Sequence, residues 1–207
     1  MSRPRRSNGS WRERQERDPY VLQARNEGWR SRAVYKLEQI DQKERVLRPD
    51  MTCIDLGSAP GSWSQYVTDK LKGRTRIVAV DLLTMDTLPS VEFLQGDFRD
   101  AQVLAALRQA LGAERADLVM SDMAPNISGN RAVDQPRAML LSELALEFCQ
   151  EILKQRGDFI CKLFQGEGSD AFIKESRRLF KRVKVMKPKA SRAGSREVYL
   201  VARNYQL

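Results

Sequence analysis

From residue 51 onward, the sequence alternates between short apolar runs and longer amphipathic stretches. Short apolar runs bounded by glycine, aspartate or proline are typical of buried strands, whereas the longer stretches have helical spacing. Strands that alternate with helices predict a mostly parallel sheet with helices on both faces. We therefore expect an α/β fold with strands in MTCIDLG (51–57), RIVAVDLL (76–83), VEFLQGD (91–97), ADLVMSD (116–122) and DFICKLF (158–164).

The segments around this series predict the rest of the fold. After Ser31, which can cap a helix, apolar residues at helical spacing predict a lead-in helix that carries Lys36. The segments 181–187 and 196–204 predict an antiparallel hairpin that closes the sheet. Further helices are expected at about 61–71, 101–111, 137–153 and 170–180.

The length of 207 residues suits one medium-sized domain. We expect residues 1–19, rich in arginine, serine and glycine, to form a flexible basic arm, and residues 20–207 to form that domain. No apolar run approaches the roughly 18 residues that a membrane helix needs. The three cysteines stand far apart and the chain has no histidine, so we expect no metal site, reduced thiols and a cytoplasmic location.

The net charge of +9 is unevenly distributed along the chain. Residues 1–36 and 171–207 carry net charges of +6 and +9, whereas residues 37–170 carry −6. Two basic ends around an acidic centre favour a polyanion such as nucleic acid, held at the rim of a site that itself binds something positive. A charge pattern that only keeps the protein soluble is the plainer alternative.

Polar residues that end the predicted strands are the candidate site residues, because ligands bind at the carboxyl ends of parallel strands. Several carboxylates in one crevice would repel one another, which makes sense when the ligand brings hydroxyl groups, amino groups or positive charge. Because histidine is absent, proton transfer near neutral pH needs another group. The candidates are Asp55, Asp81, Asp97, Asp122 and Lys162.

The segment DLGSAPGSW, residues 55–63, follows the first predicted strand and opens a helix. Gly57 and Gly61 allow a tight turn, and Asp81 ends the second strand, where an acid hydrogen-bonds ribose hydroxyls. This combination predicts a nucleoside cofactor. A glycine turn with a helix-capping aspartate, and no ligand, is the alternative.

Two cofactors fit this pattern, a nicotinamide dinucleotide and S-adenosylmethionine. The dinucleotide needs an open turn for its pyrophosphate, and Pro60 crowds that turn. The sulfonium cation of S-adenosylmethionine would instead be stabilised by Asp55 and Asp122, and Asp97 could accept a hydrogen bond from the adenine amino group. We favour S-adenosylmethionine.

Lys162 lies within the apolar run ICKLF, residues 160–164, where burying its charged side chain would cost free energy. The segment SDMAPN, residues 121–126, follows the preceding strand, and alone it is as typical of an ordinary turn as of a substrate site. Together, Lys162 and Asp122 predict an ammonium and carboxylate pair at the mouth of the cofactor site.

Six motifs occur in this order: DLGSAPGSWSQ, DLLTMD, LQGDFRD, SDMAPN, KLFQGEG and SRAGSREVY. With these motifs the chain resembles, from about residue 20 to the C-terminus, the FtsJ/RrmJ family of bacterial 2′-O-ribose methyltransferases, which modify a uridine of large-subunit (23S) ribosomal RNA. The resemblance implies a Rossmann-like, S-adenosylmethionine-dependent methyltransferase. We expect a monomer that acts on the assembled large subunit, with naked RNA as the alternative substrate, and neither DNA nor membrane as partner.

The resemblance also implies which residues do the chemistry. One departure is Ser62, where the family often has a second glycine. The implied catalytic residues are Lys36, Asp122, Lys162 and Glu197. The implied cofactor contacts are Gly61, Trp63, Asp81, Asp97 and Asp122, with no metal.

In this reading Lys162 is the candidate general base, and it must be neutral to act so. Burial, the sulfonium charge and Lys36 would lower its pKa from the reference of about 10.4, whereas Asp122 and Glu197 would raise it. A lysine that stays charged would orient the hydroxyl instead. Basic residues of the arm and of 174–192 are the predicted RNA contacts.

Three other functions remain open at this point. A nicotinamide-dependent oxidoreductase would share the fold, and a non-catalytic RNA-binding protein would share the basic ends. The third is a methyltransferase of the same type that acts on transfer RNA or messenger RNA.

Overall fold

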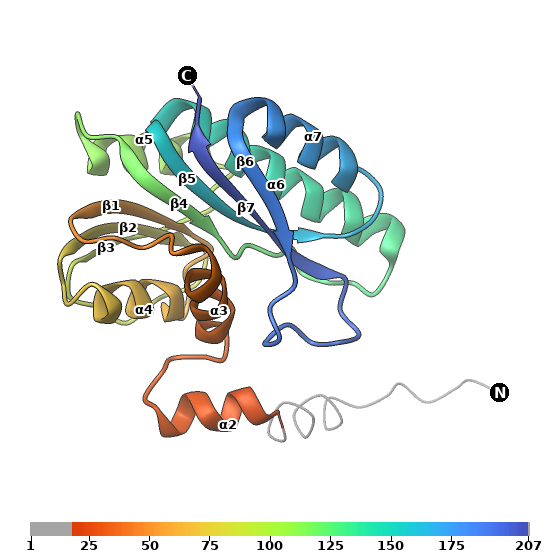
Figure 1. The fold of residues 1–207 in the computed structure, drawn as a ribbon, viewed down its shortest axis with the longest axis horizontal. Coiled ribbons are helices and arrows are strands. Elements are labelled where there is room, and N and C mark those ends of the chain that lie inside the picture. The colour runs from red at the N-terminus through yellow and green to blue at the C-terminus, as the bar shows by residue number, and fades with distance from the viewer. Residues whose placement is uncertain (1–17, 207) are drawn as a thin grey trace.

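The computed structural model describes residues 18–206, which contain one seven-stranded sheet (Figure 1). The strands are β1 (Met51–Leu56), β2 (Thr75–Asp81), β3 (Val91–Gln95), β4 (Ala116–Ser121), β5 (Leu153–Phe164), β6 (Phe180–Met186) and β7 (Glu197–Tyr205). Their order is β3-β2-β1-β4-β5-β7-β6, and neighbours among the first five strands are parallel. β7 is antiparallel to both β5 and β6. The predicted α/β fold with a C-terminal antiparallel hairpin is confirmed.

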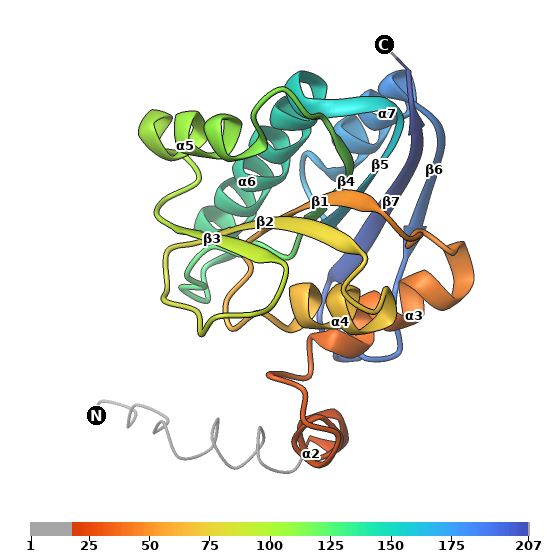
Figure 2. The ribbon, with the colours of Figure 1, turned by 90° about the vertical axis from the view of Figure 1, so that its left-hand side faces the viewer.

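Helices cover both faces of this sheet (Figures 1 and 2). They are α2 (Pro19–Asn26), α3 (Val34–Glu44), α4 (Ser62–Lys70), α5 (Ala101–Leu111), α6 (Arg131–Ile152) and α7 (Ser169–Leu179). Residues of α3 and α4 form one core cluster, and residues of α5, α6 and α7 form another. Successive strand residues enter opposite clusters, as Ile160 and Cys161 do, because side chains alternate across a strand.

The N-terminal region contains the predicted arm and, after it, a helix that was not predicted. The predicted arm, residues 1–19, lies outside the described residues except for Asp18 and Pro19, so it stays a prediction. α2 was not predicted; the Asp18 carboxylate caps it by accepting from the backbone N–H of Tyr20 at 3.1 Å. None of the helices in the described part of the chain has the length and apolar character needed to cross a membrane.

The longest helix, α6, begins at Arg131, before the predicted start near residue 137. The prediction began after Pro136 because proline disrupts a helix interior. The early start is fixed by side chains: Asn130 caps the helix, and the Asp134 carboxylate accepts two backbone N–H groups of the preceding loop at 2.9 Å each. Local capping therefore outweighs the cost of the proline.

β5 also begins earlier than predicted, directly after α6. Its first residue, Leu153, pairs with Ala116, but Asp158 already pairs with Leu118, so the two strands change register between these pairs. The extra residues include Arg156, which has a left-handed backbone with φ of 68°. Because these residues are polar and irregular, the alternating pattern that reveals a strand is missing there.

Candidate active site

Lys162 lies near the carboxyl end of β5, on the sheet face that α3 and α4 cover, two residues after Ile160 of that core cluster. Its side chain is only 8% exposed, so it does not extend into water. The Nζ atom donates a hydrogen bond to the backbone carbonyl of Asp122 at 2.7 Å and lies 3.0 Å from Asp122 Oδ1. The predicted lysine and carboxylate pair is therefore formed.

The strand register explains why these two residues meet. Ser121, the last residue of β4, pairs with Cys161 of β5, so Asp122 leaves its strand beside Lys162. The backbone N–H of Asp122 donates to Leu56 O at 3.1 Å, which holds it against the end of β1. Three adjacent strand ends thus converge on one point.

Glu197 and Lys36 reach this point from opposite ends of the chain. β7 runs antiparallel to β5, which places its first residue, Glu197, opposite Phe164 at the carboxyl end of β5. Lys36 projects from the first turn of α3, and its Nζ lies 2.8 Å from Glu197 Oε1. Glu197 Oε2 lies 4.0 Å from Lys162 Nζ. The four predicted side chains therefore form an alternating chain of two lysine amino groups and two carboxylates, which we call the ion-pair cluster.

Tyr199 also belongs to this site, and the sequence reasoning missed it. Its hydroxyl donates to Asp122 Oδ1 at 2.5 Å, and Lys36 Nζ lies 5.6 Å from the centre of its ring. Tyr199 pairs directly with Lys162 across the two strands. Since it lies two residues after Glu197 in an alternating strand, the period of two could have identified it.

Ser191 is a second residue that the sequence did not reveal. It lies in the loop between β6 and β7, is 6% exposed, and its Oγ donates to Glu197 Oε1 at 2.8 Å. This is the same oxygen that contacts Lys36. No periodic pattern marks a loop serine of this kind.

Opposite charges set the protonation of the cluster. Burial would raise the pKa of Asp122, but Lys162 and Lys36, together with the Tyr199 hydroxyl, hold that pKa below its usual value. Burial raises the pKa of the Tyr199 hydroxyl well above its ordinary value, and the charges of Asp122 and Glu197 act in the same direction. At neutral pH, Asp122 is therefore an anion and Tyr199 a neutral donor.

The turn between β1 and α4 is built for close backbone approach. Gly57 and Gly61 have φ angles of 76° and 103°, which favour glycine. A Cβ atom on Gly57 would lie 2.7 Å from Met123 Cγ, and one on Gly61 would lie 2.6 Å from Arg30 Nη1. The predicted use of both glycines in a tight turn agrees with this geometry.

Arg30 fixes that turn, although no pattern in the sequence marks it. Its guanidinium group donates to the carbonyl oxygens of Pro60, Asp86 and Thr87 at 3.0, 2.8 and 2.9 Å. Its backbone N–H donates to Gln65 Oε1 of α4 at 3.0 Å. Arg30 thereby joins the glycine turn to the segment that follows β2.

Asp81 and Asp97 stand at neighbouring strand ends, as predicted. The Asp81 carboxylate accepts from the backbone N–H groups of Ala59 and Leu83 at 2.9 and 2.8 Å. Asp97, just after β3, binds the Arg99 guanidinium group, whose Nη2 lies 2.6 Å from Oδ2, and this pairing lowers the pKa of Asp97. A ligand amino group at Asp97 would compete with Arg99 for the same oxygens.

The side chain of Trp63 is buried in the core and is not available to stack on a ligand. Its indole is buried, its Nε1 donates to Ala33 O at 2.9 Å, and its ring centre lies 5.7 Å from that of Tyr199. The side chain therefore packs α4 against α3. The first backbone N–H groups of α4, including that of Trp63, have no helical acceptor, so a cofactor contact from Trp63 would come from its main chain.

Two buried oxygen atoms at this turn lack a hydrogen-bond partner that a ligand could supply. Asp55 Oδ1 and Ser58 Oγ are both buried and lack a hydrogen-bond partner, whereas Asp55 Oδ2 accepts from Ser64 Oγ at 2.6 Å. Burial, together with the charges of Asp122 and Asp81, raises the pKa of Asp55 to about 7 against the hydrogen bonds from Ser64. The residues present thus fit the predicted S-adenosylmethionine. Within residues 18–206, no group of three His, Cys, Asp or Glu side chains is arranged to hold a metal ion.

Comparison with solved structures places this arrangement among methyltransferases. The chain is similar to a crystal structure assigned as a ribosomal RNA methyltransferase of Plasmodium falciparum, with 29% identity and a TM-score of 0.78, over 86% of this chain and 98% of that one. It is also similar to human methyltransferase-like protein 13 in complex with S-adenosylhomocysteine, with 18% identity and a TM-score of 0.57, over 83% and 82% of the two chains. The second likeness shows the fold alone.

A family model gives the same answer over most of the sequence. The model described as FtsJ-like methyltransferase matches residues 29–205, which include the glycine turn and all four members of the ion-pair cluster. The match confirms the predicted methyltransferase fold and enzyme class, with S-adenosylmethionine as cofactor. The chain therefore belongs to the family of FtsJ-like methyltransferases.

Proposed function

We propose that this protein transfers the methyl group of S-adenosylmethionine to the 2′-hydroxyl of a ribose in RNA. The observation that carries the proposal is the position of Lys162, whose amine lies between Asp122 and Glu197 at the carboxyl edge of the sheet. Because the chain has no histidine, this amine is the group best placed to accept the hydroxyl proton.

The cofactor would lie against the glycine turn and supply the methyl group when bound. Its sulfonium end would face Asp55 and Asp122; the Asp122 anion suits a cation, and a bound cation would favour the ionised form of Asp55. The residues proposed to hold it are Gly61, Trp63, Asp81, Asp97 and Asp122.

The ion-pair cluster would position the ribose and manage its proton. In its neutral form, the Lys162 amine accepts the proton of the 2′-hydroxyl as that oxygen takes up the methyl group, and the ammonium so formed is held by Asp122 Oδ1 and the Asp122 carbonyl, which already lie 3.0 and 2.7 Å from Nζ. Lys36, anchored by Glu197, orients the hydroxyl from the α3 side. Holding the nucleophile in one geometry is itself a large part of catalysis in such reactions.

The proposed substrate is a uridine of large-subunit (23S) ribosomal RNA in the assembled subunit. The similarity to a chain assigned as a ribosomal RNA methyltransferase supports ribosomal RNA over transfer or messenger RNA. A cytoplasmic monomer with one domain from about residue 20 completes the proposal. The three cysteines are free and buried, which suits a reducing compartment.

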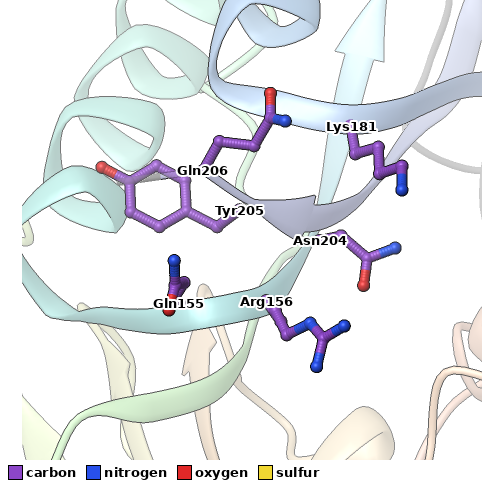
Figure 3. Close-up of a pocket in the computed structure, with 6 residues that line it drawn as sticks. All are labelled: Gln155, Arg156, Lys181, Asn204, Tyr205 and Gln206. Carbon is purple, nitrogen blue, oxygen red and sulfur yellow. The ribbon is translucent and has the colours of Figure 1, made fainter.

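The structure divides the predicted RNA contacts of the C-terminal region into groups. Arg182 and Lys184 bind Glu44 of α3, so their charges are partly neutralised. Lys181 lies at the opposite edge of the sheet, beside Arg156 and Asn204, in a pocket away from the ion-pair cluster (Figure 3). We therefore leave Lys181 out of the proposed RNA surface.

Transfer of labelled methyl groups tests the reaction. The purified protein is incubated with S-adenosylmethionine labelled in its methyl group and with large subunits from cells that lack the gene, and the RNA is then digested to nucleosides. We expect the label in 2′-O-methyluridine. Label in a base, or no label in RNA, would contradict the proposal, and binding of a reduced nicotinamide dinucleotide would support the oxidoreductase instead.

A further inference from the structure

A pocket of about 460 Å³ lies beside the ion-pair cluster, where three distant segments of the chain meet. These segments are the start of α2, the residues before α3, and the loop between β6 and β7, which both views place on the same side of the molecule (Figures 1 and 2). The residues that matter here are Asp18, Tyr20, Arg32, Lys189, Ser191 and Arg192.

The pocket shares a wall with the ion-pair cluster. Ser191 lines the pocket, and its Oγ donates to the Glu197 oxygen that also contacts Lys36. A group bound in the pocket is thus separated from Lys36 by one serine and one carboxylate. Whatever occupies the pocket lies next to the point where the proposed ribose hydroxyl reacts.

The charge of the pocket favours an anion. Three of its lining residues, Arg32, Lys189 and Arg192, are cationic, and one, Asp18, is anionic. Asp18 pairs with Arg32 and, at the longer distance of 3.8 Å, with Arg192, whose side chain stays 54% exposed. Within residues 18–206, the Lys189 ammonium has neither an ion pair nor a hydrogen bond. Lys189 is thus available to a ligand, and Arg192 is held only by a long, exposed ion pair.

The aromatic ring in the pocket is already engaged. The Arg32 guanidinium lies 5.7 Å from the centre of the Tyr20 ring, and that ring packs against Tyr35 with centres 5.4 Å apart. A nucleic-acid base that stacked on Tyr20 would have to displace one of these contacts. The geometry therefore favours a phosphate over a base.

We propose that this pocket binds a backbone phosphate of the RNA substrate, next to the ribose that is methylated. The inference rests on the proposed function. In RNA, the 2′-hydroxyl and the 3′-phosphate stand on adjacent ribose carbons, so a ribose held at Lys162 brings a phosphate close to Ser191. Phosphate contacts of this kind fix the register of a nucleic acid without reading its sequence.

Two charge-matched double variants test the pocket. Lys189→Gln/Arg192→Gln removes two of its cations, and Arg156→Gln/Lys181→Gln removes two cations at the far edge of the sheet (Figure 3). RNA affinity is measured by filter binding of large-subunit RNA over a series of salt concentrations. Affinity for S-adenosylmethionine is measured separately by calorimetry, and methyl transfer is measured over a range of RNA concentrations.

The pocket variant should bind RNA at least about tenfold more weakly at physiological salt, with a salt slope smaller by about one, because the contact with one phosphate is lost. KM for RNA should rise while kcat and cofactor affinity stay within about twofold of the wild type. The far-edge variant should match the wild type. Equal loss in both variants, or none in the pocket variant, overturns the inference. If the wild type transfers no methyl group to RNA, the proposed function fails, whatever the two variants show in binding.

Discussion

At the scale of single residues, the site depends on charges that face one another out of water. Isolating one buried charge costs several kcal/mol, so Asp122 and Lys162 each require the other. Tyr199 adds a donor to the same carboxylate. Truncating any member would leave its partner uncompensated, and conservative replacements are therefore the informative ones.

Lys162→Arg tests the proposed base directly, because arginine keeps the charge and cannot give up a proton. We expect methyl transfer to fall by roughly 10²–10⁴-fold, the range for a lost general base, with cofactor affinity unchanged. Single-turnover transfer of labelled methyl groups measures it. Lys154→Arg on the same strand, where Lys154 pairs with Asp117 at 2.8 Å away from the site, is the control and should keep the wild-type rate. A fully active Lys162→Arg enzyme would show that charge alone suffices.

Tyr199→Phe removes the hydroxyl that donates to Asp122. Since a hydrogen bond to a charged group contributes about 1.5–3 kcal/mol, the free energy of unfolding in urea should fall by that amount. Tyr205→Phe, on the same strand, loses only a 3.4 Å contact with the neutral Gln150 carbonyl and should cost clearly less. Equal costs for the two variants would argue against a special role for the Tyr199 hydroxyl.

Site residues could be predicted from the sequence only when their position along a strand determines which residues they meet. Asp122 and Lys162 could be found because they end neighbouring strands of a parallel sheet. Lys36 and Glu197 were supplied by the resemblance, since the proximity of a helix start and a strand start depends on the antiparallel insertion of β7. Ser191 and Arg30 lie in irregular segments, whose side-chain contacts no periodicity describes.

At the scale of elements, the glycine turn between β1 and α4 joins the sheet to the cofactor. Its shape depends on residues that approach from elsewhere, Arg30 and Met123 among them. A Cβ atom on Gly57 would meet backbone atoms of Met123 at 3.0 Å, so a side chain there requires a shift of the backbone.

Gly61→Ala should lower both stability and cofactor affinity. A Cβ atom there meets Arg30 Nη1 at 2.6 Å and Met85 Sδ at 2.8 Å, in addition to the strain of a φ of 103°. Urea unfolding and calorimetric titration with S-adenosylmethionine measure the two losses, and strain alone costs about 1–3 kcal/mol. Gly112→Ala carries strain at φ 64° with no atom within 4 Å, so it should lose stability and keep the cofactor affinity. Wild-type affinity in Gly61→Ala would exclude the turn as the binding site.

Most elements followed from periodicity, because apolar runs and helical spacing are local properties. The errors fall where local rules compete. α6 extends through Pro136 because capping by Asn130 and Asp134 fixes its start, and β5 begins in the polar residues after Leu153, which only their pairing with β4 identifies as strand.

At the scale of the whole molecule, the charge distribution and the fold act together. Arg32, Lys189 and Arg192, which come from the two basic regions of the sequence, line a pocket beside the ion-pair cluster, so RNA and a cationic cofactor can meet at that edge of the sheet. At the same edge of the sheet, Asp55 is buried beside Asp81 and Asp122. The burial of this carboxyl group lowers the stability of the folded protein by an amount that depends on pH.

The pKa of Asp55 is about 7 in the folded protein and near 3.9 in an unfolded chain. Asp55 therefore binds more protons in the folded state between these values, and its contribution to stability falls as pH rises from about 4 to 7 and then levels off. Asp55→Asn removes this dependence, so its stability relative to the wild type should grow by about 4 kcal/mol, as an order of magnitude, over that range. Urea unfolding of both proteins at several pH values measures the difference. A difference that is independent of pH would contradict the raised pKa.

Mapping of 2′-O-methyl groups on total RNA, from cells with and without this gene, tests the central claim most directly. The account predicts that one uridine of large-subunit ribosomal RNA loses its 2′-O-methyl group when the gene is absent and regains it when the wild-type gene, but not Lys162→Arg, is returned. Unchanged ribosomal RNA, or loss of marks only on transfer or messenger RNA, would contradict it.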